Sequence, residues 1–132
     1  MENSRMSKQE LLNLISELNI PKEEFYVVSS GALVLRNILQ DAGDLDIVIT
    51  ELGLQKLKEH YNLVQKENGW YKVTENIECV CDKKEASSYQ SELVNGYYVQ
   101  NINEYLKYLE SSTREKDKKR IPLVKKYIEA QK

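Results

Sequence analysis

The sequence has little glycine and proline, with five glycines and two prolines among 132 residues. This composition leaves no long linker and no low-complexity tract, and no internal repeat is visible. Hydrophobic residues make up 41% of the chain and charged residues 30%, the balance of a globular protein rather than a disordered one. We therefore expect a single domain over residues 1–132.

Cysteine and histidine are also scarce, which argues against a structural zinc site. Zinc needs four ligands, whereas the chain has one histidine, His60, and two cysteines, Cys79 and Cys81. We expect both cysteines to be reduced and buried as small hydrophobic side chains. His60 ends a predicted helix, where a surface position is expected rather than a catalytic one.

Long apolar runs are absent as well. None approaches the roughly 18 residues of a membrane-spanning helix, so we expect no membrane partner. The first ten residues have no apolar segment behind a basic one, and we do not expect them to be a secretion signal. Together with the low cysteine content, this predicts a cytoplasmic protein.

Charge is unevenly distributed, although the net charge is only −2. Residues 111–132 contain eight lysines and arginines against three acidic residues, whereas residues 1–110 are acidic. We expect residues 103–132 to form a basic helical segment of the domain. A local positive field attracts the phosphates of a nucleotide or a nucleic acid, and a solvated helix face is the alternative explanation.

The hydrophobic pattern predicts an α+β fold in which helices flank a small mixed sheet. Residues 7–10 form a capping box ahead of the first helix, and Pro122 is expected in the first turn of the last helix, where proline is tolerated. Residues 41–43 are expected to form a turn and residues 83–91 a polar loop. The predicted helices cover residues 8–18, 32–39, 52–60, 103–109 and 121–130, and the predicted extended segments cover 25–28, 45–49, 61–65, 70–74, 76–82 and 97–99.

Asp44 and Asp46 are the most informative pair of residues. They stand two residues apart at the start of a predicted strand, so both carboxylates project from the same face. An acid inside an otherwise apolar strand needs a positive charge to compensate its burial. A divalent metal supplies that charge, and Mg²⁺ binds one or two carboxylates together with phosphate oxygens.

A third acid is expected on a neighbouring strand. Glu78 and Asp82 lie on the same face of the extended segment 76–82, so alternation alone does not separate them. Glu78 is flanked by the apolar residues Ile77 and Cys79, which places it inside the sheet. We therefore predict that Glu78 is the third acid.

The pair Ser29-Ser30 follows one predicted strand and precedes a helix. At such a turn, backbone N–H groups and a hydroxyl approach a phosphate group. Three carboxylates, a phosphate-binding turn and a basic tail are together the components of two-metal phosphoryl or nucleotidyl transfer.

The order of these motifs resembles the DNA polymerase β-like nucleotidyltransferase superfamily. Its signature is an apolar strand, Gly-Gly or Gly-Ser, a spacer of about 9–13 residues, then Asp-h-Asp/Glu-h, where h is apolar, and a third acid on a later strand. The matching segments are Val28-Ser29-Ser30, the spacer 31–43, Asp44-Leu45-Asp46-Ile47 and Ile77-Glu78-Cys79. The resemblance implies a minimal nucleotidyltransferase fold that moves a nucleoside monophosphate from an NTP to a hydroxyl acceptor. It further implies two Mg²⁺ ions held by Asp44, Asp46 and Glu78, with Ser29 and Ser30 at the triphosphate.

The C-terminal part resembles small bacterial and phage members of this superfamily, related to AbiEii-type abortive-infection proteins and to aminoglycoside- or lincosamide-modifying enzymes. These have a glycine, a short strand, a helix with a lysine, and then R-x-K-D, which residues 95–107 and 114–117 follow in order. The resemblance, which covers residues 25–130, implies that Lys107, Arg114 and Lys116 bind the phosphates. We expect Asp117 to pair with Arg114 or Lys116.

Four departures from the family pattern leave alternatives open: Ser29 in place of glycine, Ala42 in place of Thr or Ser, Arg120 in place of an acid, and Pro122 in a region that is usually helical. Of these, Ser29 and Ala42 favour a non-catalytic regulatory or antitoxin-like binding protein that keeps the fold, whereas the presence of all three acids argues against it. Asp-x-Asp also occurs in glycosyltransferases, although 132 residues are few for their nucleotide-sugar domain. For an enzyme, the hydroxyl acceptor is a small molecule, an RNA or a protein, and a homodimer sharing one cleft is compatible with so small a domain.

Overall fold

The computed structural model describes residues 5–81 and 92–131. Within these ranges the chain forms a mixed seven-stranded sheet, a two-stranded sheet and five α-helices, which confirms the α+β class. The elements are β1 (Met6–Ser7), α1 (Lys8–Glu17), the 3₁₀ helix η1 (Lys22–Glu24), β2 (Phe25–Val28), α2 (Ser29–Leu35), β3 (Asp41–Ala42), β4 (Leu45–Ile49), α3 (Glu51–His60), β5 (Val64–Gln65), β6 (Tyr71–Thr74), β7 (Ile77–Cys81), β8 (Glu92–Val94), β9 (Tyr97–Val99), α4 (Ile102–Ser111) and α5 (Glu115–Ala130).

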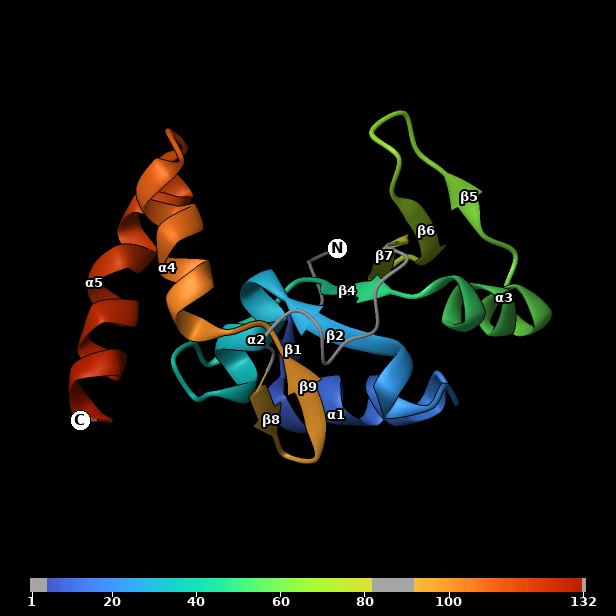
Figure 1. Ribbon diagram of the computed structural model, residues 1–132, viewed down its shortest axis with the longest axis horizontal. Helices are drawn as coiled ribbons and strands as arrows, with labels where there is room; N and C mark the ends of the chain where they lie inside the picture. Colours follow the sequence, from blue (N-terminus) through green and yellow to red (C-terminus); the bar gives the residue numbers. More distant parts are fainter. Residues whose placement is uncertain (1–4, 82–91, 132) are drawn as a thin grey trace.

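The strand order of the main sheet brings the expected site residues together. The order is β5-β6-β7-β4-β2-β9-β8 (Figure 1), with β4 parallel to β7 and antiparallel to β2. Val28 at the end of β2 stands opposite Asp46 near the start of β4, and Glu78 of β7 stands opposite Asp46 on the other side. The turn after β2 and the residues before β4 therefore meet at the same end of these two central strands.

The core lies on the face of the sheet away from Asp46. Leu45, Ile47 and Ile49 alternate with the polar-face positions of β4, and each is at most 1% exposed. The helix α1 packs its apolar stripe into the same core. It begins with the predicted capping box. The Glu10 backbone N–H donates to the Ser7 side chain, and the Ser7 backbone N–H donates to the Glu10 side chain.

The helices α4 and α5 form an antiparallel pair at one end of the molecule (Figure 1). Their facing sides enclose a second cluster with one residue of α2, and its buried members are Leu33, Ile102, Tyr105, Leu109 and Val124. The pair begins at the end of β9, where the Asn101 side chain accepts hydrogen bonds from the backbone N–H groups of Asn103 and Glu104. This cap fixes the direction in which α4 leaves the sheet.

The helix α2 is shifted toward the N-terminus, because it covers Ser29–Leu35 instead of the expected 32–39. Its end is set by Asn37, which adopts a left-handed conformation with φ 65°. The Ile38 N–H then donates to the Leu33 carbonyl at 2.8 Å, a Schellman-type helix end that asparagine favours. The expected turn at 41–43 was also wrong, because Asp41–Ala42 forms β3 and pairs with β1.

The last helix starts six residues earlier than expected, and Pro122 lies in its interior rather than in its first turn. Proline has no N–H, so the carbonyl of Lys118 loses its helical hydrogen bond. Pro122 and Lys118 are both exposed, so that carbonyl lies in an exposed part of the helix rather than in the core. The prediction was wrong because it used the general preference of proline for a first helical turn.

The other strands of the main sheet are close to expectation with one addition, and β1 of the two-stranded sheet was not predicted either. The unpredicted strand β8 pairs with β9 through Asn95 and Gly96, whose φ values of 54° and 84° suit a tight hairpin turn. Asp82 and the loop expected over 83–91 lie outside the described residues. Both cysteines are reduced as predicted, and Cys79 is buried whereas Cys81 is half-buried. None of the described helices has the length and apolar character needed to cross a membrane.

Candidate functional site

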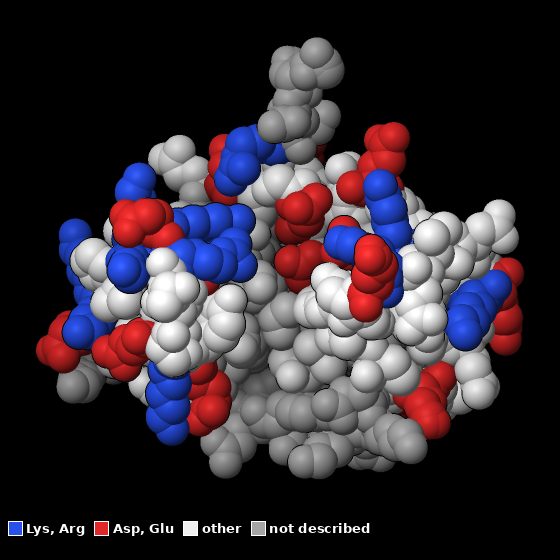
Figure 2. Space-filling model, turned by 90° about the horizontal axis from the view of Figure 1, so that it is seen from above, with Lys and Arg blue, Asp and Glu red and all other residues white. Residues whose placement is uncertain are grey.

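A small polar pocket of about 120 Å³ lies where the start of α2, β4, α4 and α5 meet. It collects side chains from four distant parts of the sequence, including most of the residues expected to act together. Its lining residues are Ser29, Ser30, Asp44, Asp46, Tyr105, Tyr108, Arg114, Lys116, Asp117 and Arg120. In Figure 2, blue basic side chains over the helical end of the molecule lie beside red acidic side chains near the middle of the same face.

Asp44 and Asp46 both face this pocket, as their spacing predicts. Asp44 directly precedes β4 and is exposed, whereas Asp46 lies within the strand and is half-buried. Between them, Leu45 is fully buried and its N–H donates to the carbonyl of Asn76 at 2.7 Å. The buried leucine thus fixes both carboxylates on the opposite, pocket-facing side of the strand.

The Asp46 carboxyl is short of positive charge. Burial, followed by the negative charges of Asp44 and Glu78, raises its pKa from 3.8 to about 6, while Lys116 and Lys66 act in the opposite direction. Burial and nearby negative charges disfavour the ionised carboxylate, whereas nearby positive charges favour it. A divalent cation bound by both aspartates would relieve this repulsion, and Mg²⁺ accepts such an oxygen set when phosphate oxygens complete it. The donor chemistry therefore fits Mg²⁺.

Glu78 lies beside Asp46 in register but does not line the pocket. Both of its carboxylate oxygens accept hydrogen bonds from Lys66 Nζ at 3.0 Å. Lys66 belongs to the β5–β6 hairpin, where its N–H donates to the Trp70 carbonyl. Within the described ranges, no three His, Cys, Asp or Glu side chains are grouped so as to hold a metal ion.

The turn at Ser29 and Ser30 forms the wall of the pocket next to the two aspartates. Ser29 adopts φ 61°, the left-handed region in which glycine is unstrained and other residues are not. Its backbone N–H donates to Gln100 Oε1 at 3.4 Å. Glycine would adopt this turn without strain, and serine adopts it at the expense of strain.

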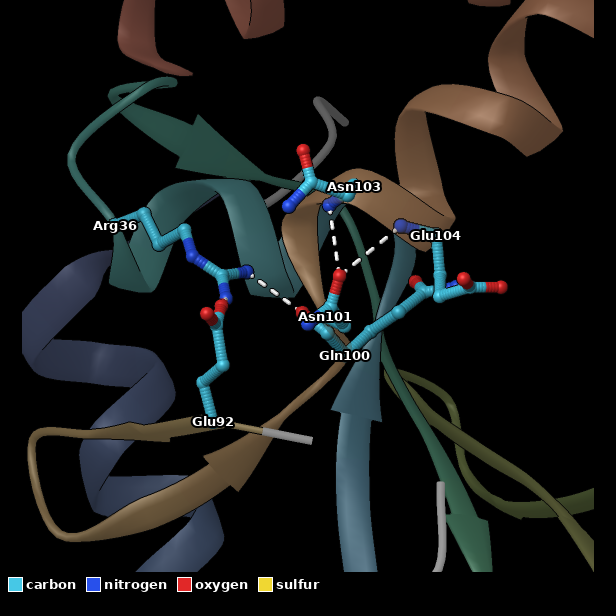
Figure 3. Close-up of polar contacts among 6 residues, drawn as sticks. All are labelled: Arg36, Glu92, Gln100, Asn101, Asn103 and Glu104. Atoms are coloured by element: carbon cyan, nitrogen blue, oxygen red, sulfur yellow. Dashed lines mark hydrogen bonds and ion pairs between the residues drawn. The ribbon is translucent and has the colours of Figure 1, made fainter. Parts of the chain in front are cut away.

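A buried arginine holds this turn and the start of α4 in place (Figure 3). Arg36 donates from Nη1 to the Gln100 carbonyl at 2.8 Å and pairs through Nη2 with Glu92. Its side chain is only 2% exposed. Because Gln100 contacts Ser29 and the next residue caps α4, Arg36 supports two walls of the pocket at once.

Replacing Ser29 with glycine is expected to stabilise the protein. The change removes left-handed strain of roughly 1–2 kcal/mol, part of which is offset by the greater freedom of glycine in the unfolded chain. We expect a net gain of about 0.5–1 kcal/mol in the free energy of unfolding, measured by urea denaturation with an unchanged m-value. Ser30→Gly is the matched control. Ser30 is helical without a positive φ, so this change should destabilise by a similar amount, and a loss of stability in Ser29→Gly would contradict the strain.

The basic wall of the pocket comes from the first turns of α5. Arg114, Lys116 and Arg120 line it, and the structure fixes Arg114 through Asp117. The Asp117 side chain is 3% exposed and lies 3.7 Å from Arg114 Nε, and it accepts a hydrogen bond from Ser112 Oγ at 2.7 Å. The pairing of Asp117 with Arg114 is the structural role that the sequence suggested.

Other residues named from the sequence lie away from the pocket. Lys107 is exposed on α4 and pairs with Glu104 at 3.4 Å, so the structure does not bring it to the two aspartates. Lys125 on α5 pairs with Glu110 at 3.7 Å. The aromatic Tyr97 packs near Phe25, with ring centroids 6.4 Å apart.

Besides Asp117, three pocket residues were not assigned there from the sequence: Tyr105, Tyr108 and Arg120. Tyr105 and Tyr108 stand three residues apart on α4 with nearly parallel rings, and Arg120 donates to the Tyr105 hydroxyl at 3.1 Å. A longer predicted α5 would have revealed Arg120, because positions 116 and 120 share a helix face. Comparisons with family models, with curated proteins and with solved structures find no match for the chain.

Proposed function

We propose that the protein is a Mg²⁺-dependent nucleotidyltransferase, similar to the DNA polymerase β-like superfamily, that moves a nucleoside monophosphate from an NTP to a hydroxyl acceptor. The observation that carries the proposal is the pocket in which Asp44 and Asp46 face a wall of basic side chains. Acidic groups on one side suit metal ions, and basic groups on the other suit phosphates. A site that binds both suits a metal-bound triphosphate.

Each wall has its own role in this proposal. Mg²⁺ held by Asp44 and Asp46 would neutralise charge that develops on the transferred and leaving phosphates. Arg114 and Lys116 bind the outer phosphates, and the turn at Ser29 and Ser30 orients them. The acceptor oxygen forms a bond to the α-phosphorus, its proton passes to a site carboxylate, and pyrophosphate leaves with the electrons of the broken bond.

Glu78 has a conditional role. It neighbours Asp46 in register and, once released from Lys66, is placed to complete a second metal site and to assist removal of the acceptor proton. If Glu78 stays bonded to Lys66 when a nucleotide binds, the protein is instead a nucleotide-binding regulatory protein without transfer activity. The bidentate contact with Lys66 is the one observation that favours this second function.

Isothermal titration with each of the four NTPs, with and without Mg²⁺, tests the proposal directly. We expect at least one NTP to bind in a Mg²⁺-dependent manner, and incubation of that NTP with candidate hydroxyl acceptors to release pyrophosphate. Mg²⁺-dependent binding without pyrophosphate release from any acceptor favours the regulatory function. The absence of any Mg²⁺-dependent binding would contradict both. In this proposal the hydroxyl acceptor is a small molecule, an RNA or a protein. A homodimer that shares one cleft is compatible with the proposal.

Replacing Arg114 and Lys116 together with alanine should weaken Mg²⁺–NTP binding by about 1–3 kcal/mol, the range of hydrogen bonds to charged groups. The matched control replaces Lys125 and Lys126 with alanine. This change removes the same charge from the same helix, but the two residues do not line the pocket. We expect the control to bind like the wild type at 0.15 M salt. Equal losses in both variants, measured by titration calorimetry, would mean that a diffuse field rather than direct contact attracts the phosphates.

A further inference from the structure

One of the three cations in the pocket, Arg114, has a close carboxylate partner, because it lies 3.7 Å from the buried carboxylate of Asp117. Arg120 forms no ion pair with any carboxylate in residues 5–81 and 92–131. It is nevertheless half-buried and lines the same pocket.

Among the residues that the structure describes, Arg120 has one hydrogen-bond partner, the Tyr105 hydroxyl. Its Nη1 donates to the Tyr105 hydroxyl at 3.1 Å, whereas a guanidinium carries five N–H donors. Tyr105 is 3% exposed, and burial raises its pKa, so the phenol stays neutral and compensates no charge. A half-buried guanidinium without an anionic partner is unfavourable unless a ligand supplies the anion.

The form of the pocket restricts that ligand. A volume of about 120 Å³ holds a few phosphoryl groups but not a whole nucleotide, and the planar fork of arginine pairs with two oxygens of one phosphoryl group. Arg114 and Lys116 stand beside Arg120 on the same wall. Several adjacent cations match a chain of phosphoryl groups better than a single anion.

We propose that Arg120, oriented by Tyr105, forms a phosphoryl subsite that binds the terminal phosphates of an oligophosphate without a metal ion. This inference rests on the proposed function and deepens it, because it assigns the outer phosphates of the NTP to Arg120, which lines the same pocket as the two aspartates. Arg120 stands where the resembling family has an acid, so the subsite is a property of this chain. Arg120 is a binding residue, and Tyr105 positions it.

The test is binding of inorganic tripolyphosphate in excess EDTA, measured by titration calorimetry. We expect the wild type to bind tripolyphosphate more tightly than inorganic phosphate, and Arg120→Gln to weaken tripolyphosphate binding about tenfold or more. Lys119→Gln is the matched control, because it removes one positive charge from the adjacent, exposed position of α5 that does not line the pocket. It should change binding less than twofold.

Two further variants separate direct binding from loss of structure. Tyr105→Phe keeps the ring and the charge of Arg120 but removes the hydroxyl, and should give a smaller loss than Arg120→Gln. Arg120→Lys should restore part of the affinity. Wild-type affinity in Arg120→Gln, an equal loss in Lys119→Gln, or no binding by the wild type in EDTA would each overturn the inference.

The two experiments distinguish a failure of the Arg120 subsite from a failure of the proposed function. If the wild type shows no Mg²⁺-dependent NTP binding but Arg120-dependent tripolyphosphate binding in EDTA, the nucleotidyltransferase fails and the subsite stands. If Mg²⁺–NTP binding is intact in Arg120→Gln, the subsite fails and the nucleotidyltransferase stands. ATP in EDTA distinguishes the two sources of the phosphates: an affinity equal to that of tripolyphosphate means that the subsite recognises the phosphates alone.

Discussion

Changing Asp44 and Asp46 together to asparagine is expected to abolish Mg²⁺-dependent NTP binding and, at the same time, to stabilise the protein. The two carboxylates face one pocket, and the double change removes both of the side chains proposed to hold the metal. In a protein without metal, the same two charges repel each other and Glu78. Binding and stability should therefore change in opposite directions, which general misfolding of the variant would not produce.

The stability difference should depend on pH through Asp46. Its pKa is raised from 3.8 to about 6 in the folded protein, so the folded state holds this proton more tightly than the unfolded state does. The wild type should therefore lose up to about 3 kcal/mol of stability as the pH rises from about 4 to about 6, and little more above that. The double variant lacks the carboxyl and should show no such decline in urea denaturation across this range.

Asp41→Asn is the control for this double variant. Asp41 is an acid near the same strand, but it pairs with Arg5 at 2.7 Å and does not line the pocket. It should leave NTP binding unchanged and, as an exposed ion pair, alter stability by less than about 1 kcal/mol. Mg²⁺–NTP binding at wild-type affinity in the double variant would show that the metal assignment is wrong.

The acidic half of the site follows from local rules, and so it was predictable. Side-chain alternation in β4 places Asp44 and Asp46 opposite the buried Leu45, and a strand that alternates in this way has only one register that buries its apolar side chains. The same alternation in β7 separates Glu78 from Ile77 and Cys79, but its place beside Asp46 depends on the pairing of β7 with β4. Only the assignments within each strand needed no knowledge of which segments meet in space.

The basic half depends on tertiary contacts that no local pattern contains. Arg120 enters the pocket because α5 starts at Glu115 and packs against α4, whereas Pro122 suggested a later start. Lys66 reaches Glu78, twelve residues further along the chain, because the β5–β6 hairpin folds beside β7. The asparagine that ends α2 was a local signal that the hydrophobic pattern concealed.

Glu78→Gln is expected to reduce nucleotidyl transfer by about 10²–10⁴-fold, the usual contribution of a positioned general base. NTP binding should fall much less, because Asp44 and Asp46 remain to hold a metal. The glutamine keeps the size of the side chain and its hydrogen bond to Lys66 through the amide oxygen. The single-turnover rate of pyrophosphate release, compared with the Kd for Mg²⁺–NTP, measures the two effects separately.

Lys66 determines how this result is interpreted, because it holds both oxygens of Glu78. If Glu78 acts in transfer only after leaving Lys66, then Lys66→Gln should raise the affinity for Mg²⁺ in the presence of an NTP, and it should do so only where Glu78 is intact. Lys72→Gln is the matched control, since Lys72 stands opposite Glu78 on β6 and forms no ion pair within the described part of the chain. Loss of NTP binding and transfer to the same extent in Glu78→Gln would mean that Glu78 supports the fold of the pocket rather than the reaction. Unchanged transfer would exclude it as the third acid.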